Sequence, residues 1–245
     1  MVEHLTCNED VVSSTLTGGS ISPSSQVARQ ESAKLPSSVR FRSRTPSSVY
    51  NKMTRQEIIQ NLIQRVNAKN YLEIGIGDGK VFERIQCDKK TSVDPCFSDG
   101  SQDLSPTFKL TSDAFFEQNR ETFDVIFIDG LHEANQVERD MNNSLKALNT
   151  NGFIVCHDMN PTSENMQKVP RIQNEWTGDC WKAWVRIRTS NPHLSMCVVD
   201  TDYGCGIIQK GSQELLELLT YENLNNNRKE WLNLISVRDF IKLCT

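Results

Sequence analysis

Carboxylates and imidazoles follow two apolar runs of the sequence. These residues are Asp129 and His132 after the run FDVIFI, and His157 and Asp158 after the run FIVC. Imidazole is the usual general base near neutral pH, and carboxylates can bind a divalent cation. Because charged groups are seldom buried without a partner, residues of these types at the ends of apolar runs predict a catalytic site.

A glycine-rich turn follows a third apolar run, in the sequence YLEIGIGDGK. Glu73 lies near the end of this run, and Gly75, Gly77 and Gly79 occupy alternate positions after it, so these four residues are candidates for cofactor binding. Glycine allows a sharp turn and a close approach of the backbone to a ligand, and the following helix offers free N–H groups. The large side chain of Lys80 stands where the nicotinamide-dinucleotide fingerprint has a third glycine, which opposes that class of cofactor.

Two further carboxylates follow short apolar stretches. Asp94, in TSVDP, could accept both hydroxyls of a ribose, or it could simply begin an Asp-Pro turn. Asp113, in LTSDAFF, could accept from an adenine amino group, cap the helix that follows, or do both. Both residues are candidates for cofactor binding.

These side chains must be positioned by alternating strands and helices. Apolar runs predict strands at residues 70–76, 91–94, 107–111, 122–129 and 152–158, and a hairpin at 194–211. Helical spacing of apolar residues predicts helices at 53–67, 80–86, 113–120, 133–148, 179–188, 212–224 and 227–243. Such alternation implies right-handed crossovers and a mainly parallel sheet with helices on both faces. The carboxyl ends of parallel strands then meet at one ligand crevice.

The quoted motifs, in this order, resemble those of the class I S-adenosylmethionine-dependent methyltransferases. The similarity is to the branch in which the fourth strand ends in Asp-Gly-x-His, and it extends from about residue 68 to residue 210. It implies an α/β fold with a Rossmann-like doubly wound sheet of seven strands, in the order 3-2-1-4-5-7-6 with strand 7 antiparallel. It also implies that the three alternate glycines line the cofactor, that Asp94 holds its ribose and that Asp113 lies beside its adenine.

The predicted reaction is methyl transfer to a small-molecule acceptor, with an oxygen nucleophile favoured. Because the donor is already activated, the protein has to position the acceptor and remove its proton. His132 is the candidate base, although it could instead pack against or cap the next helix. Asp129 and Asp158 are candidate Mg²⁺ ligands, with Asn160 as a further oxygen donor. Metal-dependent sugar methyltransferases that resemble this pattern carry an acid where this chain has His157. Without a metal, Asp129 would orient the amino group of the cofactor.

Two other classes of function remain open from the sequence. One is a cofactor-binding regulatory or interaction protein without catalysis, which the intact set of Asp129, His132 and Asp158 opposes. The other is an NAD-dependent oxidoreductase, which Lys80 and the lack of a recognisable substrate domain oppose. Nucleic-acid base methylation is disfavoured because neither N-P-P-Y nor D-P-P-Y follows strand four, and the net charge is −4.

The segment between the fifth strand and the following helix, residues 159–178, is a candidate lid because long polar loops in compact domains are usually functional. Trp176, Trp181 and Trp184 could form a wall of the acceptor site, although the spacing of Trp181 and Trp184 favours a helix face buried in the core. Asp179 is predicted to cap its own helix.

Composition predicts the domain boundary and the location of the protein in the cell. Residues 1–48 are rich in Ser and Thr without apolar periodicity, which predicts a disordered tail before a methyltransferase domain at 49–245. No apolar run could span a bilayer, and the N-terminus lacks the features of a secretory signal. The eight cysteines form no C-x-x-C pair, so a reducing compartment and a cytoplasmic location are expected.

Overall fold

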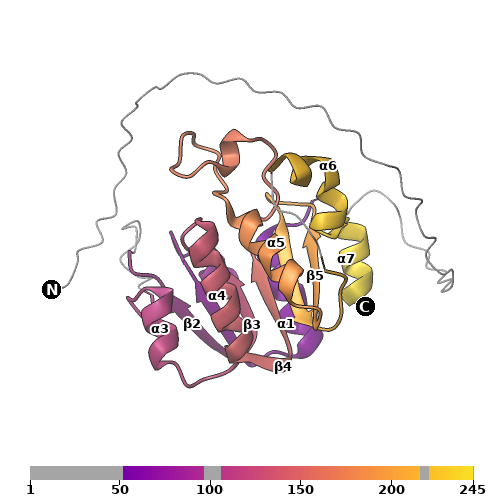
Figure 1. Ribbon diagram of the computed structural model, residues 1–245. Helices are drawn as coiled ribbons and strands as arrows, with labels where there is room; N and C mark the ends of the chain where they lie inside the picture. Colours follow the sequence, from indigo (N-terminus) through magenta and orange to yellow (C-terminus); the bar gives the residue numbers. More distant parts are fainter. Residues whose placement is uncertain (1–51, 97–105, 216–220, 245) are drawn as a thin grey trace, which may run out of the picture. The chain divides into compact units, whose positions relative to one another are not determined.

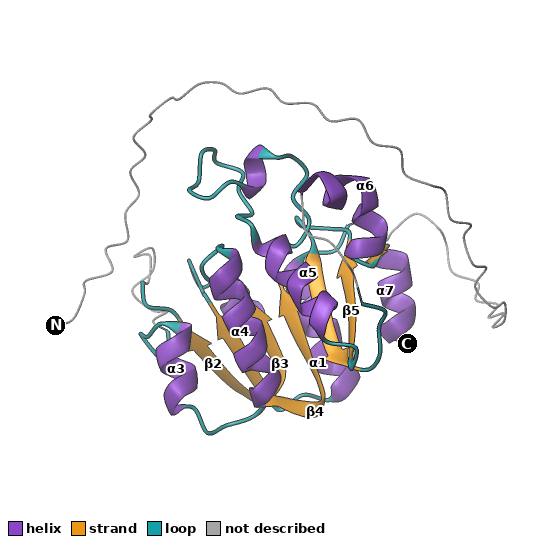
Figure 2. Ribbon diagram, viewed as in Figure 1, coloured by secondary structure: helices purple, strands orange, loops and turns teal. Residues whose placement is uncertain are grey.

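The computed structural model describes residues 52–96, 106–215 and 221–244. Within these residues, helices pack around a seven-stranded sheet (Figure 1, Figure 2). The strands are β1 Asn70–Ile74, β2 Lys89–Val93, β3 Phe123–Ile128, β4 Leu148–Cys156, β5 Leu194–Val199, β6 Cys205–Lys210 and β7 Leu234–Ile235. Their order is β2-β1-β3-β4-β6-β5-β7. Strand β6 is antiparallel to both neighbours, and the other pairs are parallel. The Rossmann-like seven-stranded sheet is therefore confirmed, and β6 stands where the antiparallel strand 7 was expected.

The two edges of the sheet differ in detail from the expected seven strands. Residues 107–111 do not form a strand, and Phe108 makes only an isolated bridge with Val93. The reason is a competing side-chain exchange, in which Thr107 Oγ1 accepts from the Ser92 N–H and Ser92 Oγ accepts from the Thr107 N–H. The seventh strand is instead the short β7, which pairs with β5 at the opposite edge.

Helices cover both faces of the sheet, as the alternating pattern predicted. The helices are α1 Arg55–Val66, α2 Lys80–Arg84, α3 Ser112–Gln118, α4 Ala134–Ala147, the single 3₁₀ turn η1 Asn165–Gln167, α5 Cys180–Ser190, α6 Tyr221–Trp231 and α7 Val237–Cys244. Apolar side chains of α4 and α5 bury one face of the strands, and those of α1 and α7 bury the other. In Figure 1, α3, α4 and α5 lie in front of the sheet and α1 lies behind it.

The predicted C-terminal helices are only partly correct. Residues 216–220 of the predicted helix 212–224 lie outside the described residues, and α6 begins at Tyr221. The predicted helix 227–243 is wrong as one element, because β7 interrupts it between α6 and α7. Leu234 and Ile235 pair with Val198 and Val199 of β5, so an available sheet edge overrides helical periodicity there. None of the described helices is long and apolar enough to cross a membrane.

Candidate active site

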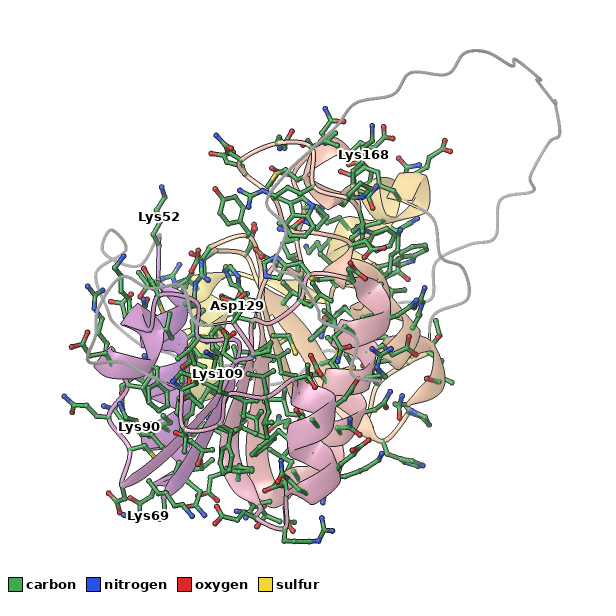
Figure 3. All side chains as sticks on the ribbon, turned by 90° about the vertical axis from the view of Figure 1, so that its left-hand side faces the viewer. Lys52, Lys69, Lys90, Lys109, Asp129 and Lys168 are labelled. Atoms are coloured by element: carbon green, nitrogen blue, oxygen red, sulfur yellow. The ribbon has the colours of Figure 1, made fainter. Side chains whose placement is uncertain are left out.

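A cleft of about 440 Å³ opens at the carboxyl ends of β1, β3 and β4, where parallel strands place their ligand-binding residues. Figure 3 shows Asp129 at this end of the sheet, Lys69 at the opposite end, and the segment that carries Lys168 beyond the cleft. The cleft is lined by Arg55, Glu73, Gly75, Ile76, Gly77, Asp78, Val81, Asp129, His132, His157, Asp158, Asn174, Glu175, Trp176 and Tyr203. Its volume is within the range of small-molecule sites.

The glycine turn forms one wall of the cleft. Gly75 has a φ of +81°, and a Cβ atom there would lie 2.2 Å from the main-chain oxygen of Asp129. Gly77 has a φ of +49°, and a Cβ atom there would meet nothing within 4 Å. The first glycine is therefore required for the close crossing of two chain segments, whereas the second borders open space in the cleft.

Asp94 holds this turn from behind. Its Oδ2 accepts hydrogen bonds from the N–H groups of Ile76 and Gly77, at 2.9 Å and 3.2 Å, and its Oδ1 accepts from the Cys96 N–H at 2.9 Å. Asp94 is 8% exposed and does not line the cleft. To accept the hydroxyls of a ribose, it would have to give up one of these N–H groups.

Glu73 lies in the floor of the cleft and is almost completely buried. Burial raises the pKa of its carboxyl group to about 8, despite the hydrogen bond that it accepts from the Tyr71 hydroxyl at 2.5 Å. The carboxyl group is therefore largely protonated at neutral pH.

Asp129 is held from two sides. Its Oδ2 lies 2.7 Å from Nη1 of Arg55, the first residue of α1. Its Oδ1 lies 3.3 Å from His132 Nε2 and 3.3 Å from His157 Nδ1. Burial favours protonation, but the two histidines hold the pKa of this carboxyl group well below its usual range.

Arg55 is fixed by a second carboxylate. Its Nε and Nη2 donate to Oδ2 and Oδ1 of Asp202, at 2.8 Å and 3.1 Å. Asp202 lies in the turn between β5 and β6, where Asp202, Tyr203 and Gly204 all have positive φ. Such conformations cost energy and are concentrated at functional sites. This turn adopts unfavourable backbone conformations, and it places Asp202 against Arg55 and Tyr203 at the border of the cleft.

His132 stands between the two predicted metal-binding carboxylates. Its Nε2 is 3.3 Å from Asp129 Oδ1, and its Nδ1 is 3.2 Å from Asp158 Oδ2. The indole of Trp176 stacks on the imidazole, with ring centroids 5.3 Å apart. The backbone of Gly178 passes so close that a Cβ atom there would lie 1.9 Å from the main-chain oxygen of His132. Burial opposes protonation, yet Asp129 and Asp158 raise the pKa of His132.

His157 and Asp158 follow β4 and are both buried. Asp158 has a φ of +63°, another sparsely populated conformation. His157 Nε2 lies 2.8 Å from the main-chain oxygen of Asp202, and its Nδ1 lies 3.2 Å from Asp158 Oδ1. Although burial opposes protonation, Asp129 and Asp158 raise the pKa of His157 well above its usual range.

Six of the predicted site residues line the cleft together, and three do not. Those that line it are Glu73, Gly75, Gly77, Asp129, His132 and Asp158. Those that do not are Gly79, which is the N-cap residue of α2, Asp94, and Asp113, which pairs with Arg139 at 3.2 Å. The roles predicted for all nine residues stay predictions.

The structure overturns two local interpretations. Thr111, not Asp113, caps α3, since its side chain accepts from the Ala114 N–H. Asp179 makes no side-chain cap to its own helix and accepts instead from the Ala134 N–H at the start of α4. The amide oxygen of Asn160 accepts from Arg228, and its role as a metal ligand stays a prediction.

The tryptophans divide between the core and the cleft. Trp181 and Trp184 are fully buried, as their helical spacing favoured, whereas Trp176 lines the cleft within the predicted lid segment. Sequence reasoning missed Arg55 and Asp202. Arg55 looked like an ordinary residue of a first helical turn, and Asp202 looked like an ordinary residue at a hairpin end. No local signal distinguishes either one.

Residues 82–159 match the family model of a methyltransferase domain. The matched segment runs from α2 to just beyond the end of β4. This part of the chain is therefore similar to a methyltransferase domain.

Solved structures of methyltransferases are similar to this chain at low identity. A putative O-methyltransferase from Klebsiella pneumoniae is 14% identical, with a TM-score of 0.48, over 64% of this chain and 80% of that chain. The methyltransferase PaMTH1 from Podospora anserina, solved with S-adenosylhomocysteine, is 15% identical, with a TM-score of 0.47, over 64% of this chain and 78% of that chain. No curated protein matches the sequence. These likenesses are too distant to bear on the acceptor.

Proposed function

We propose that this protein is an S-adenosylmethionine-dependent methyltransferase that acts on a hydroxyl oxygen of a small-molecule acceptor, with His132 as the general base. The observation that supports this proposal is the position of His132 in the cleft. Its imidazole lines the same cavity as the glycine turn and Asp129. Trp176 stacks on one side of the ring, and the backbone at Gly178 lies against the residue. A base held in this way can take the proton of an acceptor that lies beside the cofactor.

The cofactor side of the cleft is proposed to consist of Glu73, the glycine turn and Asp129, with Asp94 directed at the ribose and Asp113 at the adenine. When bound, S-adenosylmethionine supplies an activated methyl group on a sulfonium. The open space beside Gly77 lets the cofactor approach the backbone closely. Positioning the acceptor against the methyl group supplies most of the rate enhancement, because the chemistry itself asks little of the protein.

A divalent cation fits the acceptor side. Asp129, His132 and Asp158 each offer a ligand atom, and these atoms lie within 4.8 Å of one another. The Nδ1 atoms of His132 and His157 are buried and make no hydrogen bond in the described part of the chain. Asp129 and Asp158 are proposed to hold the cation, which would bind and acidify the acceptor hydroxyl.

The test combines cofactor binding with turnover. Purified protein is titrated calorimetrically with S-adenosylhomocysteine and with NAD, and is then incubated with methyl-labelled cofactor and a panel of phenols, sugars and amines. We expect binding of S-adenosylhomocysteine without binding of NAD, and label transfer to hydroxyl acceptors.

His132→Gln should lower the turnover rate by about 10²–10⁴-fold and leave the affinity for S-adenosylhomocysteine nearly unchanged. The exposed His193 provides the matched control His193→Gln, which should change neither property. Label transfer only to amines would contradict the oxygen acceptor. Cofactor binding without transfer to any acceptor would favour a cofactor-binding protein without catalysis.

A further inference from the structure

The hydrogen-bond partner of His157 determines which of its ring nitrogens carries a lone pair. The side chain is 3% exposed, and its Nε2 lies 2.8 Å from the main-chain oxygen of Asp202. A carbonyl oxygen can only accept, so Nε2 carries the hydrogen of this bond. In the neutral imidazole, Nδ1 therefore has a lone pair and no hydrogen.

That lone pair faces two carboxylates. Nδ1 of His157 lies 3.3 Å from Asp129 Oδ1 and 3.2 Å from Asp158 Oδ1, and it makes no hydrogen bond within the described residues. Three atoms with lone pairs so close together repel one another in a buried site. Arg55 neutralises the carboxylate of Asp129 from its other oxygen, at 2.7 Å from Oδ2. Between Nδ1 and the two facing oxygens, a proton or a metal ion would supply the positive charge that removes the repulsion.

We infer that the charge is a first-row transition metal ion rather than Mg²⁺, with Asp129, Asp158 and Nδ1 of His157 as its protein ligands. This inference rests on the proposed function, and it names the cation of the same site. Mg²⁺ is a hard cation that prefers oxygen ligands, whereas imidazole suits Zn²⁺, Fe²⁺, Co²⁺ and Ni²⁺. A donor set that contains a buried imidazole nitrogen selects the second group.

The distances from His157 Nδ1 to the two carboxylates agree with this choice. Ligands on a tetrahedron around a metal at about 2.0 Å are separated by about 3.3 Å, and 2.0 Å is the usual distance from Zn²⁺ to imidazole nitrogen or carboxylate oxygen. The separations from Nδ1 to the two oxygens are 3.3 Å and 3.2 Å. Three protein ligands leave a fourth position open, which an acceptor hydroxyl could fill.

The surrounding residues support the ligands as those of a metal site do. Metal-binding histidines usually donate their second ring N–H to a carbonyl or carboxylate, which fixes the ring, and the main-chain oxygen of Asp202 provides this partner. Arg55 binds the outer oxygen of Asp129 and both oxygens of Asp202. It therefore holds Oδ2 of Asp129 and the turn that orients His157, and leaves Oδ1 of Asp129 facing His157 Nδ1 and His132 Nε2, each at 3.3 Å.

Co²⁺ tests the inference without an activity assay, because its visible absorption reports nitrogen ligation and coordination number. The full-length protein is stripped with a chelator and titrated with Co²⁺, Zn²⁺ and Mg²⁺, by calorimetry and by absorption. We expect Co²⁺ and Zn²⁺ to bind at least tenfold more tightly than Mg²⁺, and Co²⁺ to give the intense bands of a four- or five-coordinate site.

Variants at position 157 show whether the imidazole is a ligand. His157→Ala should weaken Co²⁺ binding by more than roughly 100-fold, because loss of an outer partner alone costs about 10–100-fold. His157→Glu replaces the nitrogen ligand with a charged oxygen ligand and should shift the metal preference toward Mg²⁺. This variant also tests the ligand role of His157 if the alanine variant does not fold. His193→Ala should leave the Co²⁺ spectrum unchanged.

Two results would overturn the inference: tighter binding of Mg²⁺ than of Co²⁺ to the wild type, or an unchanged Co²⁺ spectrum in a folded His157→Ala variant. The first result would assign the site to Mg²⁺, and the second would assign the charge at His157 to a proton. S-adenosylhomocysteine is titrated into the same samples. Failure of the metal inference leaves that binding intact, whereas failure of the proposed function removes it.

Discussion

Glu73 shows how the cleft alters the chemistry of a single residue. The carboxyl group has a folded pKa of about 8 because of burial, compared with about 4.3 in an unfolded chain. The folded state therefore binds its proton more tightly than the unfolded state. The stability that this proton provides is complete below about pH 4 and is lost as the pH rises from about 4 to about 8.

Glu73→Gln should therefore stabilise the protein more at pH 8 than at pH 5, by a few kcal/mol, because the amide never has to ionise. It can still accept the hydrogen bond from Tyr71. Urea unfolding of wild type and variant at the two pH values gives the difference. Glu121→Gln, at an exposed ion pair with Lys89, is the control and should show no such pH dependence. Equal effects of Glu73→Gln at both pH values would rule out a buried neutral carboxyl group.

Single residues of the site were partly predictable, for a physical reason. Asp129, His132 and Asp158 follow apolar runs, and the end of a parallel strand has a known direction relative to the ligand crevice. Asp179 shows where this kind of reasoning fails. A local rule assigns it to the helix that it precedes, but its carboxylate caps the neighbouring α4 instead. Only the packing of α5 beside α4 determines that partner.

At the scale of elements, the turn from β1 to α2 contains two glycines that are needed for different reasons. Gly75 is restricted by the backbone of Asp129, whereas Gly77 borders open space. Both have positive φ, so alanine at either position costs about 1–2 kcal/mol of backbone strain. The clash at Gly75 adds to this cost because the neighbouring atoms belong to backbone.

Gly75→Ala should therefore lower the free energy of unfolding by several kcal/mol. Gly77→Ala should cost only the strain, but its methyl group would occupy space proposed for the cofactor and weaken S-adenosylhomocysteine binding by at least tenfold. Denaturant unfolding and calorimetry on both variants separate the two effects. If Gly77→Ala bound S-adenosylhomocysteine like the wild type, the proposed contact at Gly77 would be incorrect.

The elements themselves follow their apolar patterns except where another partner competes. The central strands agree with prediction because they are buried on both faces, and α4 agrees because it buries one apolar face against the sheet. The strand expected at 107–111 and the continuous helix expected at 227–243 do not form. In the first case Ser92 and Thr107 exchange hydrogen bonds through their side chains, and in the second β5 offers a free edge to β7. Both competitors are distant in sequence.

At the scale of the whole molecule, the cleft is assembled from segments far apart in the chain. Arg55 binds Asp129 at a separation of 74 residues and Asp202 at a separation of 147 residues. Its position depends on the first turn of α1, which the reciprocal hydrogen bonds of Thr54 and Glu57 begin. The sequence predicts this capping box, but not that the first residue of the helix reaches two strand ends.

The domain boundary can be tested on the same helix. Composition predicts that residues 1–48, which lie outside the described residues, form a tail apart from the methyltransferase domain. A chain that begins at residue 49 should then keep its melting temperature within about 2 °C and bind S-adenosylhomocysteine as the full chain does. A chain that begins at Glu57 loses the capping box and Arg55. Its melting temperature should fall by several degrees, and Asp129 should lose its ion-pair partner. Scanning calorimetry and cofactor titration of both truncations provide the comparison. Equal losses in the two truncations would place part of the folded domain before residue 49.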